Sequence, residues 1–441
     1  MANRITAADA FSAAETASKN PCALLWDESF LWGVMARRAL LEAGLSFDLV
    51  LAEQVRRGDL ARYRLLFVPG GWASSKRAAL GDTGCSEIRC FVEAGGNYLG
   101  ICGGAGLATR DEIALLPVGR KPSARRVTSF SGSIRVSPVE DPIWCGVEKP
   151  VFSVWWPSQL TFEDPGIRVL AAYEEAQPDA VSADISVKDG ERRGWPILEE
   201  SYGILLDPAR LRGEPAVLEG MLGRGKVVLS MLHFDTPGDR KDRIVLQNLW
   251  RLLAIDSPPP PAVGSLSPPG GPRTHISPEI LRILAEIRAC VEGLIAAGEE
   301  SMLWRWRNPF LLRWRRGVRG LEYSTLSVMV REIQDLLACD PRDPGAGGLF
   351  SGALDTNRLR GDLLEIRRLL VPFVDHAKRL IGLEWTCLRS GHLSPLHCDD
   401  REIQALRREL FGSAMSHGGA FKRLIDAVDL FWFRLVWNAD G

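Results

Sequence analysis

The residue most suited to chemistry in this sequence is Cys102, in a glycine-rich stretch where a strand-like run meets a helix-compatible run. The stretch, Leu99 to Thr109, reads LGICGGAGLAT. A sharp strand-to-helix turn lifts a nucleophile above the sheet edge, and the free N–H groups at a helix start favour a thiolate. Flanking glycines permit unusual backbone angles, and the N–H of Gly103 could face a developing oxyanion. The alternative is a small buried cysteine in a glycine-rich turn.

The candidate base for Cys102 is His233, the only histidine before a proline-rich stretch at residues 256–274. It follows the apolar run GKVVLSML, so it would emerge where a strand ends, and Asp235 lies two residues further on. Reactive groups gather at the carboxyl ends of parallel strands, so these side chains could meet Cys102 there. A thiolate nucleophile works with a base that a third group orients. The alternative for His233 is a half-buried histidine that caps a loop.

Two further segments could complete such a site. Gly70 and Gly71 end the run VPGG, and their N–H groups could add to an oxyanion hole, although a simple turn explains the pair equally well. Trp156, in the run WWP, could line a pocket because aromatic residues line most small-molecule sites. Core packing is the alternative for this tryptophan.

The elements that must position these residues alternate between strand and helix up to residue 255. Strands are predicted at 22–28, 47–55, 64–71, 97–104 and 225–233, and helices at 29–44, 85–96, 105–116 and 243–255. Between residues 121 and 216 the pattern changes to short β-like pieces. Alternation of this kind is typical of βαβ units. We therefore predict an α/β fold with a three-layer, doubly wound, mostly parallel sheet and a β-rich extension.

A stretch rich in proline and glycine, residues 256–274, divides the chain. It cannot form helix or sheet, so we expect a stiff, extended linker. We predict an N-terminal tail at 1–20, the α/β domain at 21–255, this linker, and a helical domain at 275–441. The last region has apolar residues at helical spacing and a proline near its start, which predicts an all-α bundle of four to six helices.

Composition narrows the possible partners. The formal net charge of −1 gives no overall attraction to nucleic acid or to an anionic membrane, and no apolar run is long enough to span a bilayer. The N-terminus lacks the apolar core of a secretory signal. Nine scattered cysteines without a CxxC pair favour a reduced setting over a disulfide framework or a zinc ribbon. We expect a cytoplasmic protein with no membrane span and no nucleic-acid partner, and we assign it no cofactor.

Two stretches after the linker raise the question of a ligand. Residues 303–320 hold three tryptophans and six arginines, which could lie on an anionic membrane or stack on RNA bases. Asn308 and Pro309 break any single amphipathic helix, so a bundle corner or a domain interface is the favoured interpretation. His392, His397 and Cys398 hint at a metal, but no matching fourth ligand accompanies them, and we predict no metal site.

Four segments together resemble the class I glutamine amidotransferase-like superfamily. They read LLFVPGG, AGGNYLGICGGAGLAT, VFSVWWPSQLTFEDPGIRVLAAYEE and AVLEGMLGRGKVVLSMLHFDTPGD, and they occur within residues 21–255 in the expected order. The portion from WWP to VLAAYE is similar to the domain at the N-terminus of biotin–protein ligases. The resemblance implies a three-layer α/β sandwich in which Cys102 is the nucleophile, His233 the base and Asp235 its acidic partner.

The sequence departs from these relatives in two places. Class I amidotransferases usually carry His-Pro-Glu where this chain has His-Phe-Asp, so the acid that would orient His233 is shorter. The run GRGK at residues 223–226 superficially resembles the biotinyl-adenylate loop of biotin ligases. It precedes the His233 strand, however, and nothing after the linker resembles a ligase domain. We therefore predict no biotin transfer.

A rival resemblance is to the intracellular protease and deglycase family, in which an acid from the first strand contacts the cysteine. Asp27 or Glu28 could take that place in this chain. A helix cap or an exposed loop end is the favoured interpretation of both residues.

Two functions from different classes follow from these observations. The first is a cysteine-dependent hydrolase or amidotransferase that attacks an amide or related carbonyl through a thioester at Cys102. The second is a binding or scaffold protein in which an amidotransferase-like shell is retained without catalysis. In either case we expect a small-molecule or amide substrate or ligand, and a protein partner for the helical domain.

Overall fold

The computed structural model describes residues 21–254, 276–338, 355–389, 398–412 and 417–440. The chain divides into two units, residues 1–262 and 263–441. The division falls within the proline-rich stretch 256–274, all of which lies outside the described residues, as does the expected tail at 1–20.

Five parallel strands form the centre of the N-terminal unit. In sheet order they are β2 (Asp48–Val50), β1 (Cys22–Leu25), β3 (Leu65–Val68), β4 (Asn97–Ile101) and β13 (Gly225–Ser230). Apolar residues fill β1 and β3 completely, and every residue of both strands is buried. Uniform burial of this kind is expected where helices cover both faces of a parallel sheet.

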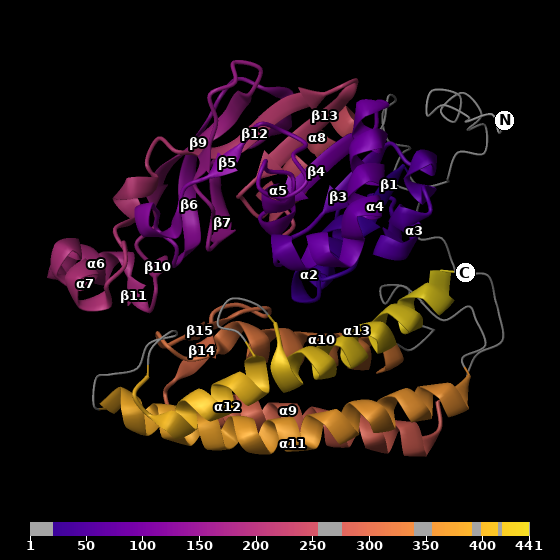
Figure 1. Cartoon of the computed structure of the whole chain (residues 1–441), viewed down its shortest axis with the longest axis vertical. Coiled ribbons are helices and arrows are strands. Elements are labelled where there is room, and N and C mark those ends of the chain that lie inside the picture. The colour runs from indigo at the N-terminus through magenta and orange to yellow at the C-terminus, as the bar shows by residue number, and fades with distance from the viewer. Residues whose placement is uncertain (1–20, 255–275, 339–354, 390–397, 413–416, 441) are drawn as a thin grey trace. The chain divides into compact units, whose positions relative to one another are not determined.

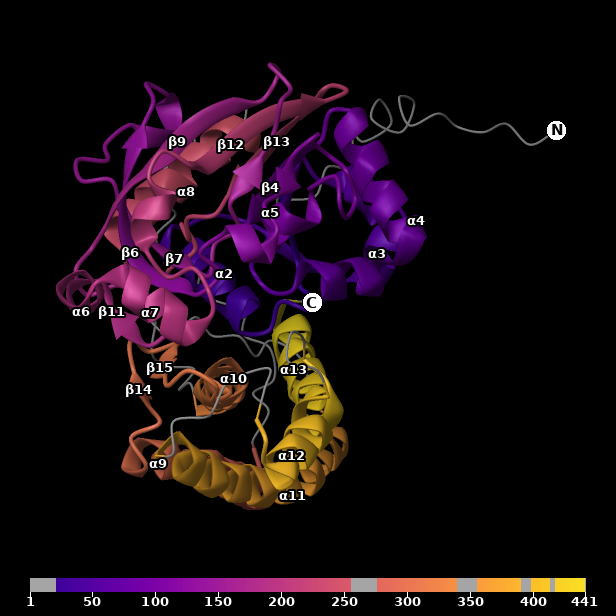
Figure 2. The ribbon, with the colours of Figure 1, turned by 60° about the vertical axis from the view of Figure 1, so that its left-hand side comes forward.

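Helices cover both faces of these strands and make the three layers (Figures 1 and 2). One layer contains α3 (Ala52–Arg56), α4 (Ala73–Glu93) and α5 (Gly103–Leu107), which pack against one another in that order. The other contains α2 (Leu31–Glu42) and α8 (Arg240–Leu253), which contact each other. The predicted doubly wound α/β architecture is confirmed.

The sheet continues beyond β13 as an antiparallel extension. Six strands build it: β12 (Pro215–Leu222), β9 (Arg168–Ala176), β6 (Phe130–Pro138), β7 (Val151–Trp155), β10 (Val181–Ser182) and β11 (Ile185–Ser186). A separate short pair joins β5 (Gly119–Arg120) to β8 (Leu160–Thr161). The β-rich extension predicted between residues 121 and 216 is therefore present.

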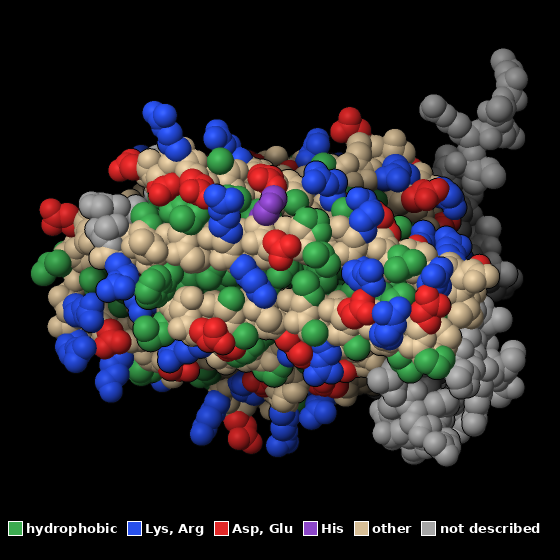
Figure 3. All heavy atoms as spheres, turned by 90° about the horizontal axis from the view of Figure 1, so that it is seen from below, with side chains coloured by type: hydrophobic (Ala, Val, Ile, Leu, Met, Phe, Trp, Pro, Cys, Tyr) green, Lys and Arg blue, Asp and Glu red, His purple; other side chains and the backbone are tan. Residues whose placement is uncertain are grey.

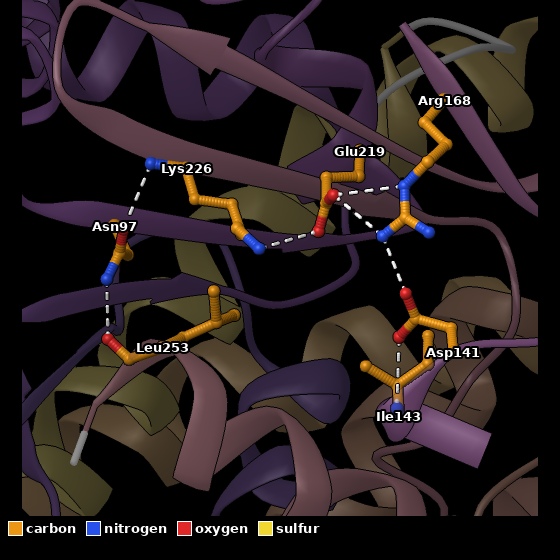
Figure 4. A network of polar contacts seen from close by, with 7 residues as sticks. All are labelled: Asn97, Asp141, Ile143, Arg168, Glu219, Lys226 and Leu253. Atoms are coloured by element: carbon orange, nitrogen blue, oxygen red, sulfur yellow. Dashed lines mark hydrogen bonds and ion pairs between the residues drawn. The ribbon is translucent and has the colours of Figure 1, made fainter. Parts of the chain in front are cut away.

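Polar contacts tie the two halves of this sheet to the neighbouring segments (Figure 4). The Arg168 guanidinium donates to Asp141 at 2.6 Å and to Glu219 at 2.9 Å, and Lys226 lies 3.1 Å from the same glutamate. Asn97 joins three elements, because it donates to the carbonyl of Leu253 at 2.7 Å and accepts from the N–H of Lys226 at 2.9 Å. Asn97 and Lys226 lie near the start of β4 and β13, at the opposite end of these strands from Ile101 and Ser230.

Several element boundaries differ from the prediction. The strand predicted at 47–55 is cut short at Val50, and α3 follows it at once. The helix after Cys102 ends at Leu107, well before residue 116. Within the β-rich extension the chain also forms α6 (Val187–Arg193) and α7 (Trp195–Tyr202), which share a small apolar core of their own. Helices this short are hard to predict from sequence, because about two turns give little periodic signal.

Five helices form most of the described part of the C-terminal unit. They are α9 (Pro278–Glu300), α10 (Gly320–Ala338), α11 (Thr356–Arg389), α12 (Arg401–Phe411) and α13 (Gly419–Asp440). The helix α11 packs along α9 and α13, while α10 lies against α9 and α13. On the face of this unit that Figure 3 shows, basic and acidic side chains are mixed with apolar ones.

The C-terminal unit is helical, as predicted, apart from one short strand pair in its described part. Between α9 and α10 the chain forms an antiparallel pair, β14 (Trp304–Trp306) and β15 (Leu312–Trp314). The turn between them is held by Asn308, whose side-chain oxygen accepts from the N–H groups of Phe310 at 2.9 Å and Leu311 at 2.8 Å. The tryptophan- and arginine-rich stretch 303–320 is thus a hairpin that packs on α9 and α10.

Among the described helices, none combines the length and the apolar character that a membrane crossing requires.

Candidate active site

Cys102 occupies the sharp turn between β4 and α5. Its backbone angles are φ 51° and ψ −103°, a conformation that non-glycine residues rarely adopt. Its N–H donates to the carbonyl of Ser230 at 2.7 Å, which ties the turn to the last residue of β13. The thiol is half-buried and directs Sγ toward the carbonyl oxygen of Trp155, 3.7 Å away. Backbone strain at a half-exposed cysteine is a feature of functional turns.

The loop that contains Gly70 and Gly71 lies directly against this turn. A Cβ atom added to Gly103 would overlap the carbonyl oxygen of Gly71, so a side chain cannot be accommodated there. Gly71 itself has φ 113°, and a Cβ atom would press on the carbonyl oxygen of Glu28. The three glycines predicted near Cys102 therefore belong to two segments. These segments are in close contact at Gly71 and Gly103.

His233 and Asp235 form a buried hydrogen-bonded pair. The imidazole Nδ1 and the carboxylate Oδ1 lie 2.8 Å apart, and both side chains are fully buried. The N–H of His233 donates to the carbonyl of Ser153 at 2.9 Å, which fixes the loop after β13 against β7. The acid is one methylene shorter than the glutamate of most class I amidotransferases, yet it still reaches Nδ1.

The strand topology brings this pair to Cys102. β4 and β13 are parallel neighbours in which Ile101 is paired with Ser230, so both strands end at the same edge. Cys102 follows one strand end and His233 comes three residues after the other. The Nε2 atom of His233 has no aligned hydrogen bond to any described residue, while the Sγ of Cys102 lies close enough to act on the charge of the ring.

Charge explains the protonation of His233. Burial by itself would lower the pKa of this imidazole. The Asp235 charge and hydrogen bond, together with the neighbouring Cys102 thiol, outweigh burial and raise the pKa of His233 from 6.5 to about 10. The imidazole is therefore protonated at neutral pH.

Two tryptophan rings enclose the imidazole. The Trp32 ring centroid lies 5.1 Å from that of His233, and the Trp155 ring lies 6.3 Å from it. Trp32 also presses on Gly70, where an added Cβ would come within 2.9 Å of the indole. Trp32 comes from the first turn of α2, and its place at the site was not predictable, because nothing in its local sequence pattern distinguishes it from a core residue.

The two tryptophans of the WWP segment have different surroundings. The ring that contacts His233 belongs to Trp155, and the carbonyl that faces the thiol is also its own. Trp156, the residue predicted to line the pocket, is half-buried with φ 51°, and its N–H donates to the carbonyl of Phe130 at 2.8 Å. Trp155 therefore contacts both the thiol and the imidazole, and the pocket-lining role of Trp156 stays a prediction.

The acids at the end of β1 have other partners. Asp27 accepts from the N–H of Ala52, the first residue of α3, at 2.7 Å. Asp27 thus satisfies a free N–H at the start of α3, although the N-cap residue of that helix is Leu51. The carbonyl of Glu28 lies against Gly71, as described above.

The described residues contain no group of three or more His, Cys, Asp or Glu side chains suited to a metal. His392 and His397, which prompted the question, lie outside that set. Cys398 is described, and its sulfur lies 3.9 Å from that of Cys387.

Comparisons with known proteins agree with the sequence resemblance. Residues 52–113 match the family model described as "Biotin-protein ligase, N terminal", a range that includes Gly70, Gly71, Cys102 and Gly103. A pyridoxal 5'-phosphate synthase subunit, PdxT, from Haloquadratum walsbyi is 25% identical over 171 residues, which cover 34% of this chain and 82% of that protein.

Two solved structures are similar over about half of the chain. The structure of PurLQS from Thermotoga maritima is 16% identical, with a TM-score of 0.37, and the match covers 53% of this chain and 99% of that one. The structure of a glutamine amidotransferase is 19% identical, with a TM-score of 0.33 and coverage of 53% and 99%. The N-terminal unit of this chain is glutamine amidotransferase-like, and its segment 52–113 carries the sequence pattern of the biotin–protein ligase N-terminal family.

Proposed function

We propose that the N-terminal unit is a cysteine-dependent hydrolase or amidotransferase that acts on an amide or related carbonyl compound. The observation that carries the proposal is the buried His233–Asp235 pair at 2.8 Å beside the half-buried thiol of Cys102. An ordered acid, base and sulfur at one sheet edge is the arrangement that nucleophilic catalysis requires.

The chemistry begins with the Cys102 thiolate attacking the carbonyl carbon. The carbonyl oxygen takes up negative charge, and the N–H groups of Gly70, Gly71 and Gly103 are the candidate donors for it. The protonated His233 then gives its proton to the leaving amine or ammonia, and a thioester remains on Cys102. Water, activated by the neutral imidazole, then attacks the thioester, which releases the acid and restores the thiolate and the protonated imidazole.

A partner protein is part of this proposal. The relative from Haloquadratum walsbyi is named as a synthase subunit, which supports a role for this unit within an assembly. We place the partner-binding role on the helical unit, residues 275–441, because the described part of the N-terminal unit is occupied by the amidotransferase-like fold. The substrate itself is a small amide-bearing molecule.

Selective labelling tests the catalytic proposal. The full-length protein is treated with a limiting amount of iodoacetamide at pH 7, and the modification of each cysteine is followed by mass spectrometry. We expect Cys102 to react at least tenfold faster than Cys90 and Cys145, because Cys102 is the cysteine that lies beside the imidazolium of His233. Both comparison cysteines are exposed, so access favours them rather than Cys102.

The controls separate catalysis from binding. Cys102→Ala should abolish the fast phase, and Cys145→Ala should leave it unchanged. If Cys102 reacts no faster than the exposed cysteines, the catalytic proposal fails. The second function, a retained shell that binds without catalysis, then becomes the better account of the N-terminal unit.

A further inference from the structure

A buried lysine, Lys76, lies directly behind the Gly70–Gly71 loop. Its side chain is 0% exposed although it comes from the first turn of α4. Removing an ammonium group from water costs several kcal/mol, and a positive charge at a helix N-terminus also opposes the helix dipole. A residue that breaks two rules of stability in one place is expected at functional sites.

The contacts of Lys76 connect two segments that border the candidate active site. Its Nζ donates to the hydroxyl of Ser29 at 2.5 Å and to the carbonyl of Asp27 at 3.2 Å, both in the turn between β1 and α2. On its other side, the Lys76 Cε atom lies 3.3 Å from the position of a Cβ on Gly71. The ammonium therefore holds the β1–α2 turn and the glycine loop together.

The Gly70–Gly71 loop contacts the turn at Cys102 directly, through backbone atoms. Gly71 is in close contact with Gly103, the residue after Cys102. A displacement of Gly71 would therefore also displace Gly103. The Nζ atom lies 3.6 Å from the same Cβ position on Gly71, so the positive charge of Lys76 is close to this loop.

We propose that Lys76 is a positioning residue for thioester formation. It fixes the Gly70–Gly71 loop and adds a positive potential behind the N–H groups that hold the oxyanion. This inference rests on the proposed function, because it assumes attack of Cys102 on a carbonyl.

Two reactions of the same sulfur distinguish this role. When the thiolate attacks p-nitrophenyl acetate, the carbonyl oxygen becomes an oxyanion, p-nitrophenolate leaves and an acetyl thioester forms. When it attacks iodoacetamide, the sulfur displaces iodide from a saturated carbon and no oxyanion develops. A group that supports the oxyanion should affect acetylation and not alkylation.

The experiment measures both rates at Cys102 in the full-length protein at pH 7. Lys76→Met keeps the length and apolar stem of the side chain and removes the charge. We expect acetylation to fall tenfold or more and alkylation to stay within twofold. Lys226→Met is the matched control, since Lys226 forms an ion pair with Glu219 in the sheet, and both rates should stay unchanged.

Two further variants keep the test valid if Lys76→Met does not fold. Lys76→Arg retains the charge and should restore at least part of the acetylation rate. Ser29→Ala removes one acceptor of Nζ and should lower acetylation at least threefold without changing alkylation.

The outcomes are separable. Unchanged acetylation in a folded Lys76→Met protein, or an equal fall in both rates, overturns the role of Lys76. A wild-type protein that is alkylated but never acetylated at Cys102 overturns the proposed function itself, and the role of Lys76 with it.

Discussion

At the scale of single residues, the protonation of His233 links the candidate chemistry to stability. The pKa of this imidazole is 6.5 in an ordinary environment and about 10 in the folded protein. Between these two pH values the folded state therefore holds a proton that the unfolded state has lost. Stability from this site is complete below pH 6.5 and is lost as the pH rises to about 10.

Replacing Asp235 by Asn should remove most of this pH dependence. The substitution keeps the shape of the side chain but deletes the charge that opposes the effect of burial on His233. We expect the wild-type free energy of unfolding to fall by a few kcal/mol between pH 6.5 and 10, at about 1.4 kcal/mol per pKa unit. In Asp235→Asn the fall should be much smaller.

Urea unfolding at intervals across this pH range measures the difference, with tryptophan fluorescence as the probe. Other groups titrate near pH 10 in both proteins, so only the difference between the two curves is interpreted. Parallel curves would show that the Asp235 charge does not control the protonation of His233.

At the scale of elements, a buried ion pair joins two helices of the C-terminal unit. Glu384 of α11 accepts from the Nε of Arg407 of α12 at 2.8 Å, and Glu384 is fully buried. Burial raises the pKa of Glu384 from 4.5 to about 7, although Arg407 acts in the opposite direction. The raised pKa means that the folded state binds this proton more tightly than the unfolded state does. The stabilisation that protonated Glu384 contributes is therefore lost as the pH rises from 4.5 to about 7.

Removing Arg407 should loosen α11 and α12 in a pH-dependent way. At pH 8 the variant Arg407→Met leaves a buried carboxylate without its partner, which costs about 3–5 kcal/mol. At pH 5 the carboxyl group is protonated and the loss should be smaller. The double variant Arg407→Met with Glu384→Gln should recover most of the stability at pH 8.

Hydrogen exchange of peptides from α11 and α12 in the full-length chain measures this local opening. Peptides from β1 and β3 in the other unit act as the internal reference. A loss that is the same at both pH values, or that the double variant does not reduce, would contradict the assigned charge effect.

The elements were predictable from the sequence where a strong local pattern was present. The apolar runs of β1 and β3 and the apolar centre of β13 indicated a parallel sheet, and the glycines around Cys102 indicated a sharp turn after β4. Trp32 and Lys76 were not predictable, because their importance comes from segments that approach through the fold. The β14–β15 hairpin was missed because a strand of three residues carries too little alternation to detect.

At the scale of the whole molecule, opposite charges are balanced and interspersed. The chain has 54 basic and 55 acidic residues. On the helical unit, α9 and α11 are joined by ion pairs such as Arg360–Glu279 at 2.7 Å and Arg367–Glu286 at 2.6 Å, and Figure 3 shows no large area of one sign. A polyanion gains little from such a surface, because few cations are available to replace its counterions.

This balance predicts that the full-length protein does not bind polyanions through its arginine-rich hairpin. At physiological salt we expect the protein to pass through a heparin column unretained and to leave single-stranded RNA unshifted in a mobility assay. The double variant Glu279→Lys with Glu286→Lys, which turns the α9–α11 face basic, should be retained and provides the positive control. If the wild-type protein is retained and Arg305→Glu with Arg315→Glu releases it, the hairpin is a polyanion site. The expected absence of a nucleic-acid partner would then be wrong, since local charge would have outweighed the balance of the whole molecule.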